Sequence, residues 1–173
     1  MNYFQLFEIP LSLRIDANAL QKKYYQLSKE YHPDRVARLD NQAQEDALQK
    51  TAEINQAKRV LENVYTRIEY ILSQNKQFHP DQKQDVPPSF LMEMMEINEQ
   101  CMEMEMENNT NQLPSIQKLF QQKQQQLEAT IAPFLQEEVL DLDSNVLQLL
   151  NDYYLQKKYL LRIQEKLEQF ETN

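Results

Sequence analysis

The complete absence of glycine limits what this chain of 173 residues can fold into more than any other feature. At the usual frequency of about 7%, a chain this long would contain about a dozen glycines. Phosphate-binding loops, dinucleotide-binding fingerprints, nucleophile elbows and EF-hand loops need glycine where the backbone takes positive φ or approaches a ligand closely. Two-residue β-hairpin turns also lose their preferred residues. The sequence therefore predicts an all-α protein.

The charge of the chain is distributed unevenly. Residues 1–78 carry 11 Lys and Arg against 10 Asp and Glu, whereas residues 79–173 carry 7 against 17. The acidic half repels nucleic-acid phosphates and anionic lipids, so we expect neither nucleic acid nor membrane as the main partner.

Cysteine usage and the N-terminal residues predict the compartment. Cys101 is the single cysteine and cannot form an internal disulfide, which is typical of a reducing environment. The first residues have no basic region followed by a long apolar run, and no later segment approaches about 18 uninterrupted apolar residues. We therefore expect a soluble, cytoplasmic protein.

Apolar spacing predicts three helices within residues 1–75. A short helix from Tyr3 to Phe7 is stopped by Pro10, and Asp16 is a good N-cap for a second helix through Tyr31. One long helix from Gln44 to Ser73 follows, and it packs antiparallel to the second. The core-facing residues of these two helices are Leu20, Tyr24, Leu27 and Tyr31, and Ile54, Ala57, Leu61, Val64, Ile68 and Ile71.

A second domain is predicted after a polar, proline-containing linker at residues 76–88. Three helices follow within residues 89–173, at Ser89 to Glu107, Ser115 to Ile131 and Ser144 to Phe170. Short connections between them favour an antiparallel three-helix bundle.

The tripeptide His-Pro-Asp occurs twice, at His32-Pro33-Asp34 and at His79-Pro80-Asp81. A plain turn, in which proline stops one helix and aspartate caps the next, explains the tripeptide alone. The first copy, however, joins a helix with a basic surface to a long helix, whereas the second lies in the polar linker. We interpret the second copy as chance. The lysines of the basic surface are Lys22, Lys23 and Lys29.

The helix from Ser89 to Glu107 has more apolar residues than one core contact requires. Phe90, Met94, Ile97, Cys101 and Met104 form a full core stripe, and Leu91, Met92, Met95, Met102 and Met106 form a second strip. Burial on two sides of the helix explains the second strip without a function. A methionine-rich strip bordered by Glu96, Glu99 and Glu103 is also typical of an adaptable protein-binding surface.

No cluster of residues indicates catalysis or a bound metal. Asp141, Asp143 and Asn145 are spaced like an EF-hand loop, but Val146 occupies the position of the turn glycine, and helix capping by Asp143 or Ser144 explains them. Cys101 lies on the core stripe, which predicts an inert thiol. We expect no metal, no cofactor and no enzymatic activity.

Two sets of residues resemble a known family. Lys22-Lys23-Tyr24 and the run from Leu27 to Arg35 resemble the second helix and loop of a J domain, the activating module of DnaJ-type co-chaperones. Residues resembling its third helix are Ile54-Asn55-Gln56-Ala57, Leu61, Arg67, Tyr70 and Leu72. Tyr3 to Phe7 and Phe90-Leu91-Met92-Glu93 resemble HscB, the J-type co-chaperone of iron–sulfur cluster assembly. Glu8 stands where the family often has glycine, and Arg35 replaces the more usual lysine.

The resemblance implies two partners and the residues that bind them. A DnaK-class ATPase chaperone, HscA in this family, is expected to bind His32, Pro33, Asp34, Lys22, Lys23, Lys29 and Arg35. The cluster scaffold IscU is expected to bind Leu91, Met92, Met95, Glu96, Glu99 and Glu103, together with an aromatic of the last helix, Tyr154. The ATP hydrolysis would belong to the chaperone. The alternatives are a J-domain protein with another client and a helical adaptor without effect on an ATPase.

Overall fold

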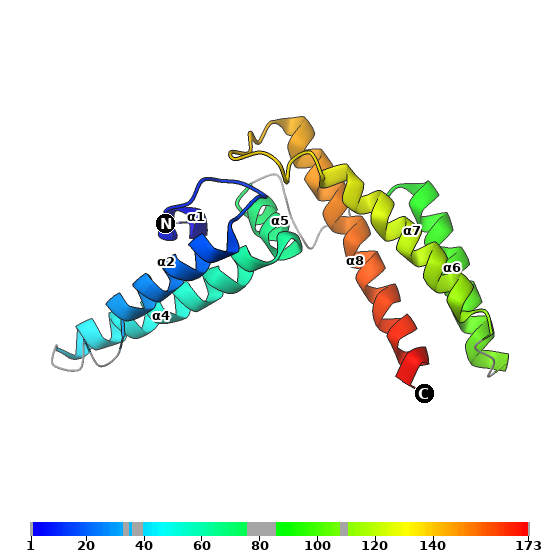
Figure 1. The fold of residues 1–173 in the computed structure, drawn as a ribbon, viewed down its shortest axis with the longest axis horizontal. Coiled ribbons are helices and arrows are strands. Elements are labelled where there is room, and N and C mark those ends of the chain that lie inside the picture. The colour runs from blue at the N-terminus through cyan, green and yellow to red at the C-terminus, as the bar shows by residue number, and fades with distance from the viewer. Residues whose placement is uncertain (1, 33–34, 36–39, 76–85, 108–110, 173) are drawn as a thin grey trace. The chain divides into compact units, whose positions relative to one another are not determined.

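The computed structural model describes residues 2–32, 35, 40–75, 86–107 and 111–172, and the regular secondary structure within this part is helical. The helices are α1 (Tyr3–Leu6), α2 (Ala17–Glu30), α4 (Asn41–Glu62), α5 (Val64–Ser73), α6 (Pro88–Glu107), α7 (Leu113–Ile131) and α8 (Ser144–Thr172) (Figure 1). The predicted all-α fold is confirmed. Contacts divide the chain into two units, Met1–Ile71 with Phe134–Asp141 and Leu72–Pro133 with Leu142–Asn173.

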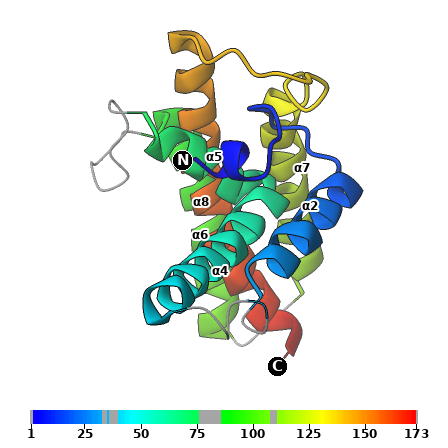
Figure 2. The same ribbon diagram turned by 90° about the vertical axis from the view of Figure 1, so that its left-hand side faces the viewer.

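A helical hairpin of α2 and α4 forms the body of the first unit. The carboxylate of Asp16 caps α2, accepting from the backbone N–H groups of Asn18 at 2.7 Å and Ala19 at 3.0 Å. The two helices lie side by side in both views (Figures 1 and 2). Their facing residues Leu20, Leu27, Ile54, Ala57 and Leu61 are all buried, as the spacing predicts.

The prediction of one long helix from Gln44 to Ser73 is wrong, because the chain bends at Asn63. Asn63 has extended backbone angles (φ −105°, ψ 130°) and separates α4 from α5. Its side-chain oxygen accepts the N–H of Tyr65 at 2.8 Å, and the Thr66 hydroxyl donates to the Val60 carbonyl at 2.9 Å. Local side-chain hydrogen bonds of this kind compete with the helical ladder. They end α4 and start α5 although the apolar spacing continues.

Arg67 is a buried cation that ties three segments of the first unit together. Its Nε donates to the Leu61 carbonyl at 2.9 Å at the end of α4, and its Nη1 donates to the Leu13 carbonyl before α2. Burial lowers the pKa of Arg67 to about 10, so the side chain stays charged at neutral pH. The guanidinium thus satisfies backbone carbonyls that would otherwise be buried without a partner.

Replacement of Arg67 is expected to destabilise this unit strongly. Arg67→Met keeps most of the apolar volume but leaves the Leu61 and Leu13 carbonyls without these donors, which should lower the free energy of unfolding by about 3 kcal/mol. Urea unfolding followed by circular dichroism measures the change. Arg59→Met on the exposed side of α4 is the matched control and should stay within about 0.5 kcal/mol of wild type. Equal stability of both variants would show that the buried hydrogen bonds contribute little.

The first unit also contains a segment from the C-terminal half of the sequence, residues 134–141. The N–H of Leu140 donates to the Leu11 carbonyl at 2.7 Å, and the Ser12 hydroxyl donates to the Glu137 carbonyl at 2.8 Å. The Leu140 side chain and Ser12 are buried. The connection between α7 and α8 is therefore part of the fold of this unit rather than a free loop.

The second unit is a bundle in which α6, α7 and α8 all contact one another. The predicted inner residues of α7, Ile116, Phe120, Leu127 and Ile131, are buried, and so is the core stripe of α6. Asp143 caps α8 by accepting the Val146 N–H at 2.8 Å, which confirms capping as the role of that aspartate. Most of the predicted linker, residues 76–85, lies outside the described residues.

Candidate functional site

The basic surface of α2 leads directly to His32. Lys22 and Lys29 are exposed and lie two turns apart on the face opposite the buried leucines. His32 follows the end of α2 and is exposed; its carbonyl accepts the Arg35 N–H at 2.9 Å. The Arg35 guanidinium lies 3.4 Å from the Lys29 carbonyl, at the negative end of the helix dipole. The structure thus brings His32, Lys29 and Arg35 together, while Pro33 and Asp34 lie outside the described residues.

Lys23 differs from its neighbours because it forms an ion pair inside the first unit. Its ammonium lies 2.6 Å from the carboxylate of Glu8, and only 20% of the Lys23 side chain is exposed. Glu8 itself has φ of 54°, the left-handed region that favours glycine. The ion pair partly neutralises Lys23, so the exposed charge of this surface belongs mainly to Lys22, Lys29 and Arg35.

The strained backbone of Glu8 gives a stability prediction. Left-handed geometry costs about 1 kcal/mol for a residue with a Cβ, and glycine avoids this cost. Glu8→Gly and Glu8→Gln both remove the ion pair with Lys23, but only the glycine also removes the strain. We therefore expect Glu8→Gly to be more stable than Glu8→Gln by about 1 kcal/mol in urea unfolding. A glutamine variant as stable as the glycine variant would contradict this account.

The second apolar strip of α6 is exposed, so the helices of the bundle do not bury α6 on two sides. The exposed fractions are 71% for Met92, 60% for Met95, 54% for Met102 and 85% for Met106, and Leu91 is half-buried. Isolated apolar residues on a surface need no explanation, but four exposed methionines on one face of a helix are more than isolated residues.

The acidic border of this strip is also exposed. Among the described residues no ion pair joins Glu96, Glu99 or Glu103 to a cation. Glutamates on the sides of the same helix behave differently: Glu93 pairs with Lys123 at 2.7 Å, and Glu105 lies 3.7 Å from Lys166. The negative charge that remains on the strip therefore favours a partner with a basic surface.

Tyr154 does not lie on this exposed surface, which corrects the expectation from the sequence. Only 3% of the residue is exposed, because α8 packs against both α6 and α7 and buries the adjacent Tyr153 as well. The more exposed aromatic of α8 is Tyr159, whose ring meets that of Phe90 edge-on with centroids 6.3 Å apart. The resemblance implies an aromatic of the last helix without fixing its position, so the sequence alone did not distinguish Tyr159 from Tyr154.

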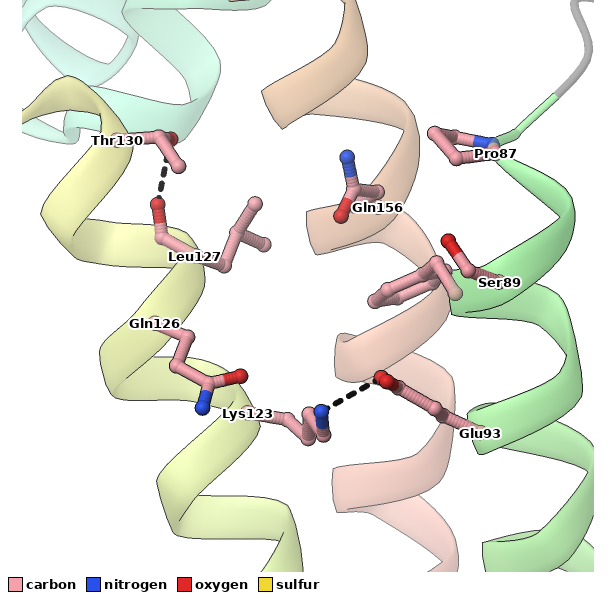
Figure 3. A pocket seen from close by; sticks show the side chains of 9 residues that line it. Pro87, Ser89, Glu93, Lys123, Gln126, Leu127, Thr130 and Gln156 are labelled. Atoms are coloured by element: carbon pink, nitrogen blue, oxygen red, sulfur yellow. Dashed lines mark hydrogen bonds and ion pairs between the residues drawn. The ribbon is translucent and has the colours of Figure 1, made fainter.

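A groove of about 330 Å³ runs between the helices of the bundle. Figure 3 shows the ion pair of Lys123 and Glu93 across it, with Gln126 of α7 and Gln156 of α8 nearby. The two charges neutralise each other, and the other polar groups of the lining are amides and hydroxyls. The groove has no pair of groups arranged for acid–base or nucleophilic catalysis.

Both halves of the chain match family models. The DnaJ domain matches residues 2–70, and the HSCB C-terminal oligomerisation domain matches residues 86–168. Curated proteins named co-chaperone protein HscB homolog are similar to this chain. The homolog of Vibrio vulnificus is 39% identical over 104 residues, and that of Colwellia psychrerythraea is 43% identical over 100 residues. The chain belongs to the HscB family.

The aligned region covers about three fifths of these relatives, 61% of the Vibrio vulnificus protein and 57% of the Colwellia psychrerythraea protein. Solved structures of HscB proteins are similar in fold to almost the whole of this chain. Chaperone HscB from Vibrio cholerae matches with a TM-score of 0.73 and 25% identity over 99% of this chain and 98% of its own. Human co-chaperone protein HscB has the same fold, with a TM-score of 0.59, 23% identity and coverage of 97% and 83%.

The thiol of this HscB-family chain is buried, and within the described residues its acidic side chains form no cluster that could hold a metal. Cys101 is fully buried, and burial raises the pKa of its thiol, as expected for an inert cysteine. No group of three or more His, Cys, Asp or Glu residues that could hold a metal occurs within the described part of the chain. In the same part no helix is long and apolar enough to cross a membrane.

Proposed function

We propose that the chain is a J-type co-chaperone of iron–sulfur cluster assembly. In this proposal residues 1–75 form the J domain, which stimulates ATP hydrolysis by a DnaK-class chaperone, HscA. Residues 89–173 form the domain that binds the scaffold protein IscU, and residues 76–88 link the two domains. The protein would act in the cytoplasm. Membership of the HscB family supports the co-chaperone role.

The observation that carries the proposal is the exposure of His32 beside Lys29 and Arg35 at the end of a rigid helical hairpin. A plain turn would need no cluster of exposed cations around it. The hairpin is fixed by its buried leucines, so His32 at the end of α2 is held in a defined position. Such preorganisation lowers the entropic cost of binding.

The exposed cations of α2 would steer the encounter with the chaperone. Long-range attraction between opposite charges raises the association rate and weakens as salt screens it. Lys22, Lys29 and Arg35 supply this attraction, and Lys23 contributes less because Glu8 neutralises it. The His32 loop would then favour the chaperone state that hydrolyses ATP. The bond breaking takes place in the chaperone, so this chain is proposed not to be an enzyme.

The exposed strip of α6 would bind the scaffold. Methionine side chains adapt to an irregular apolar partner, and the unpaired carboxylates of Glu96, Glu99 and Glu103 favour basic groups around it. One chain that binds both proteins raises their effective concentration toward each other. The expected result is synergy: the scaffold should increase chaperone stimulation beyond what either protein gives alone.

The ATPase rate of HscA with this protein added, with and without IscU, tests the proposal. Stimulation that the scaffold enhances supports both halves. Stimulation without synergy keeps the J domain and favours a different client. Absence of stimulation by well-folded protein favours the helical adaptor.

Charge reversal on α2 should weaken the chaperone interaction without affecting the fold. For Lys22→Glu with Lys29→Glu, we expect the concentration for half-maximal stimulation to rise about tenfold at low salt, and less at high salt. The matched control is Lys118→Glu with Arg162→Glu, two exposed cations of the bundle that give the same change in net charge. Equal loss in both variants would point to net charge rather than to the surface of α2.

A further inference from the structure

The sulfur atoms of this protein are divided sharply between buried and exposed positions. The single cysteine is fully buried, and α6 carries every methionine among the described residues. Met94 and Met104 are 1% and 2% exposed, whereas Met92, Met95, Met102 and Met106 are all more than half exposed. Within the described residues, the sulfur atoms that a soluble oxidant can reach are therefore those of the exposed methionines of α6.

The four exposed methionines also share one face of α6. At 100° per residue they lie within about 80° of one another, and at 1.5 Å per residue they extend over about 21 Å. Met94 and Met104 point to the opposite side, where the bundle covers them. The exposed thioethers thus coincide with the strip that is proposed to bind the scaffold.

We infer that Met92, Met95, Met102 and Met106 form an oxidation site through which a peroxide switches off partner binding at this surface. This inference rests on the proposed scaffold-binding function of the strip. In the reaction the thioether sulfur attacks one peroxide oxygen, an S–O bond forms as the O–O bond breaks, and the second oxygen leaves as water. Sulfur is oxidised by two electrons to the sulfoxide, and the peroxide is reduced.

The product changes the surface from apolar to polar. A sulfoxide oxygen is a strong hydrogen-bond acceptor, and burying it against an apolar partner leaves it without a donor. The thioether needs no deprotonation to react, so the raised pKa that protects Cys101 gives no comparable protection here. Two thiols of a methionine sulfoxide reductase system restore the thioether, forming a disulfide and releasing the oxygen as water. The switch is therefore reversible.

The bundle should tolerate this modification. All four side chains are exposed in the folded chain, so their sulfoxides stay in water and the core stripe of α6 remains packed. Oxidation of buried Met94 or Met104 would instead place a polar group in the core and destabilise the bundle. Selective oxidation thus separates loss of binding from loss of structure.

Mild hydrogen peroxide treatment of the full chain, followed by peptide mass spectrometry, tests the site itself. We expect the four exposed methionines to gain one oxygen at least ten times faster than Met94 and Met104, with unchanged helix content. Equal rates at exposed and buried positions would overturn the inference.

Binding of IscU before and after oxidation tests the consequence. We expect at least a tenfold loss of affinity, recovered after treatment with methionine sulfoxide reductases A and B. The variant that combines Met92→Leu, Met95→Leu, Met102→Leu and Met106→Leu has no sulfur in the strip to oxidise, so its affinity for IscU, whatever its starting value, should be the same before and after peroxide. Met94→Leu with Met104→Leu is the control and should remain sensitive.

The outcomes separate the inference from the proposed function. Reduced protein that binds IscU, with unchanged affinity after oxidation, overturns only the inference. Reduced protein that does not bind IscU overturns the proposed function and the inference with it. Loss of binding in the four-leucine variant after peroxide would place the sensitive group elsewhere and also overturn the inference.

Discussion

His32→Gln is expected to abolish the stimulation of HscA ATPase while leaving the co-chaperone folded. Glutamine keeps a polar side chain but lacks the imidazole ring, and the backbone carbonyl that accepts the Arg35 N–H is retained. His32 is exposed, so the free energy of unfolding should change by less than about 0.5 kcal/mol. Steady-state ATPase rates of HscA with wild type and variant measure the effect, and IscU affinity should be unchanged.

The second His-Pro-Asp tripeptide provides a matched control. His79 lies outside the described residues, and its sequence context has no basic helix leading into it. His79→Gln makes the same chemical change in the same tripeptide and should retain full stimulation. A fully active His32→Gln variant would contradict the J-domain assignment and favour the helical adaptor. Equal loss in both variants would remove the reason for treating the second tripeptide as chance.

Most of the helices and the exposed strip could be predicted because their signals are local. Asp16 comes directly before the apolar stripe of α2, and it caps that helix as expected. In α6 the core stripe accounts for the face that packs in the bundle, so Met92 and Met95 are expected on the surface, and both are exposed. Periodicity on a single helix was sufficient in each case.

The parts that could not be predicted depend on contacts between residues far apart in the sequence. The hydrogen bond from Ser12 to the Glu137 carbonyl joins residues 125 positions apart, and no local pattern indicates it. In the sequence Arg67 looks like an ordinary cation on a helix surface. In the structure it is buried, because it donates to the carbonyls of Leu13 and Leu61. Tyr154 was assigned to the partner surface from the family resemblance, but α8 packs against both α6 and α7 and buries this residue.

Met92→Ala combined with Met95→Ala is expected to weaken IscU binding by about 3 kcal/mol, or about a hundredfold. Each truncation removes most of an apolar side chain that would be buried against the scaffold. Both side chains are exposed in the free protein, and alanine is a good helix former, so the stability of the bundle should change little. Titration calorimetry measures the affinity, and thermal unfolding measures the stability.

Met94→Ala is the control that separates binding from packing. Met94 lies next to the strip in the sequence but is buried, so its truncation leaves a cavity and should cost about 2–5 kcal/mol of stability. At temperatures where this variant stays folded, its IscU affinity should be that of wild type. A double variant of Met92 and Met95 that loses stability with unchanged affinity would instead assign the strip to a packing interface. Unchanged stability together with unchanged affinity would place the scaffold on another surface. Loss of affinity in the Met92 and Met95 variant, together with loss of stability in the Met94 variant, would therefore assign the exposed face of α6 to scaffold binding.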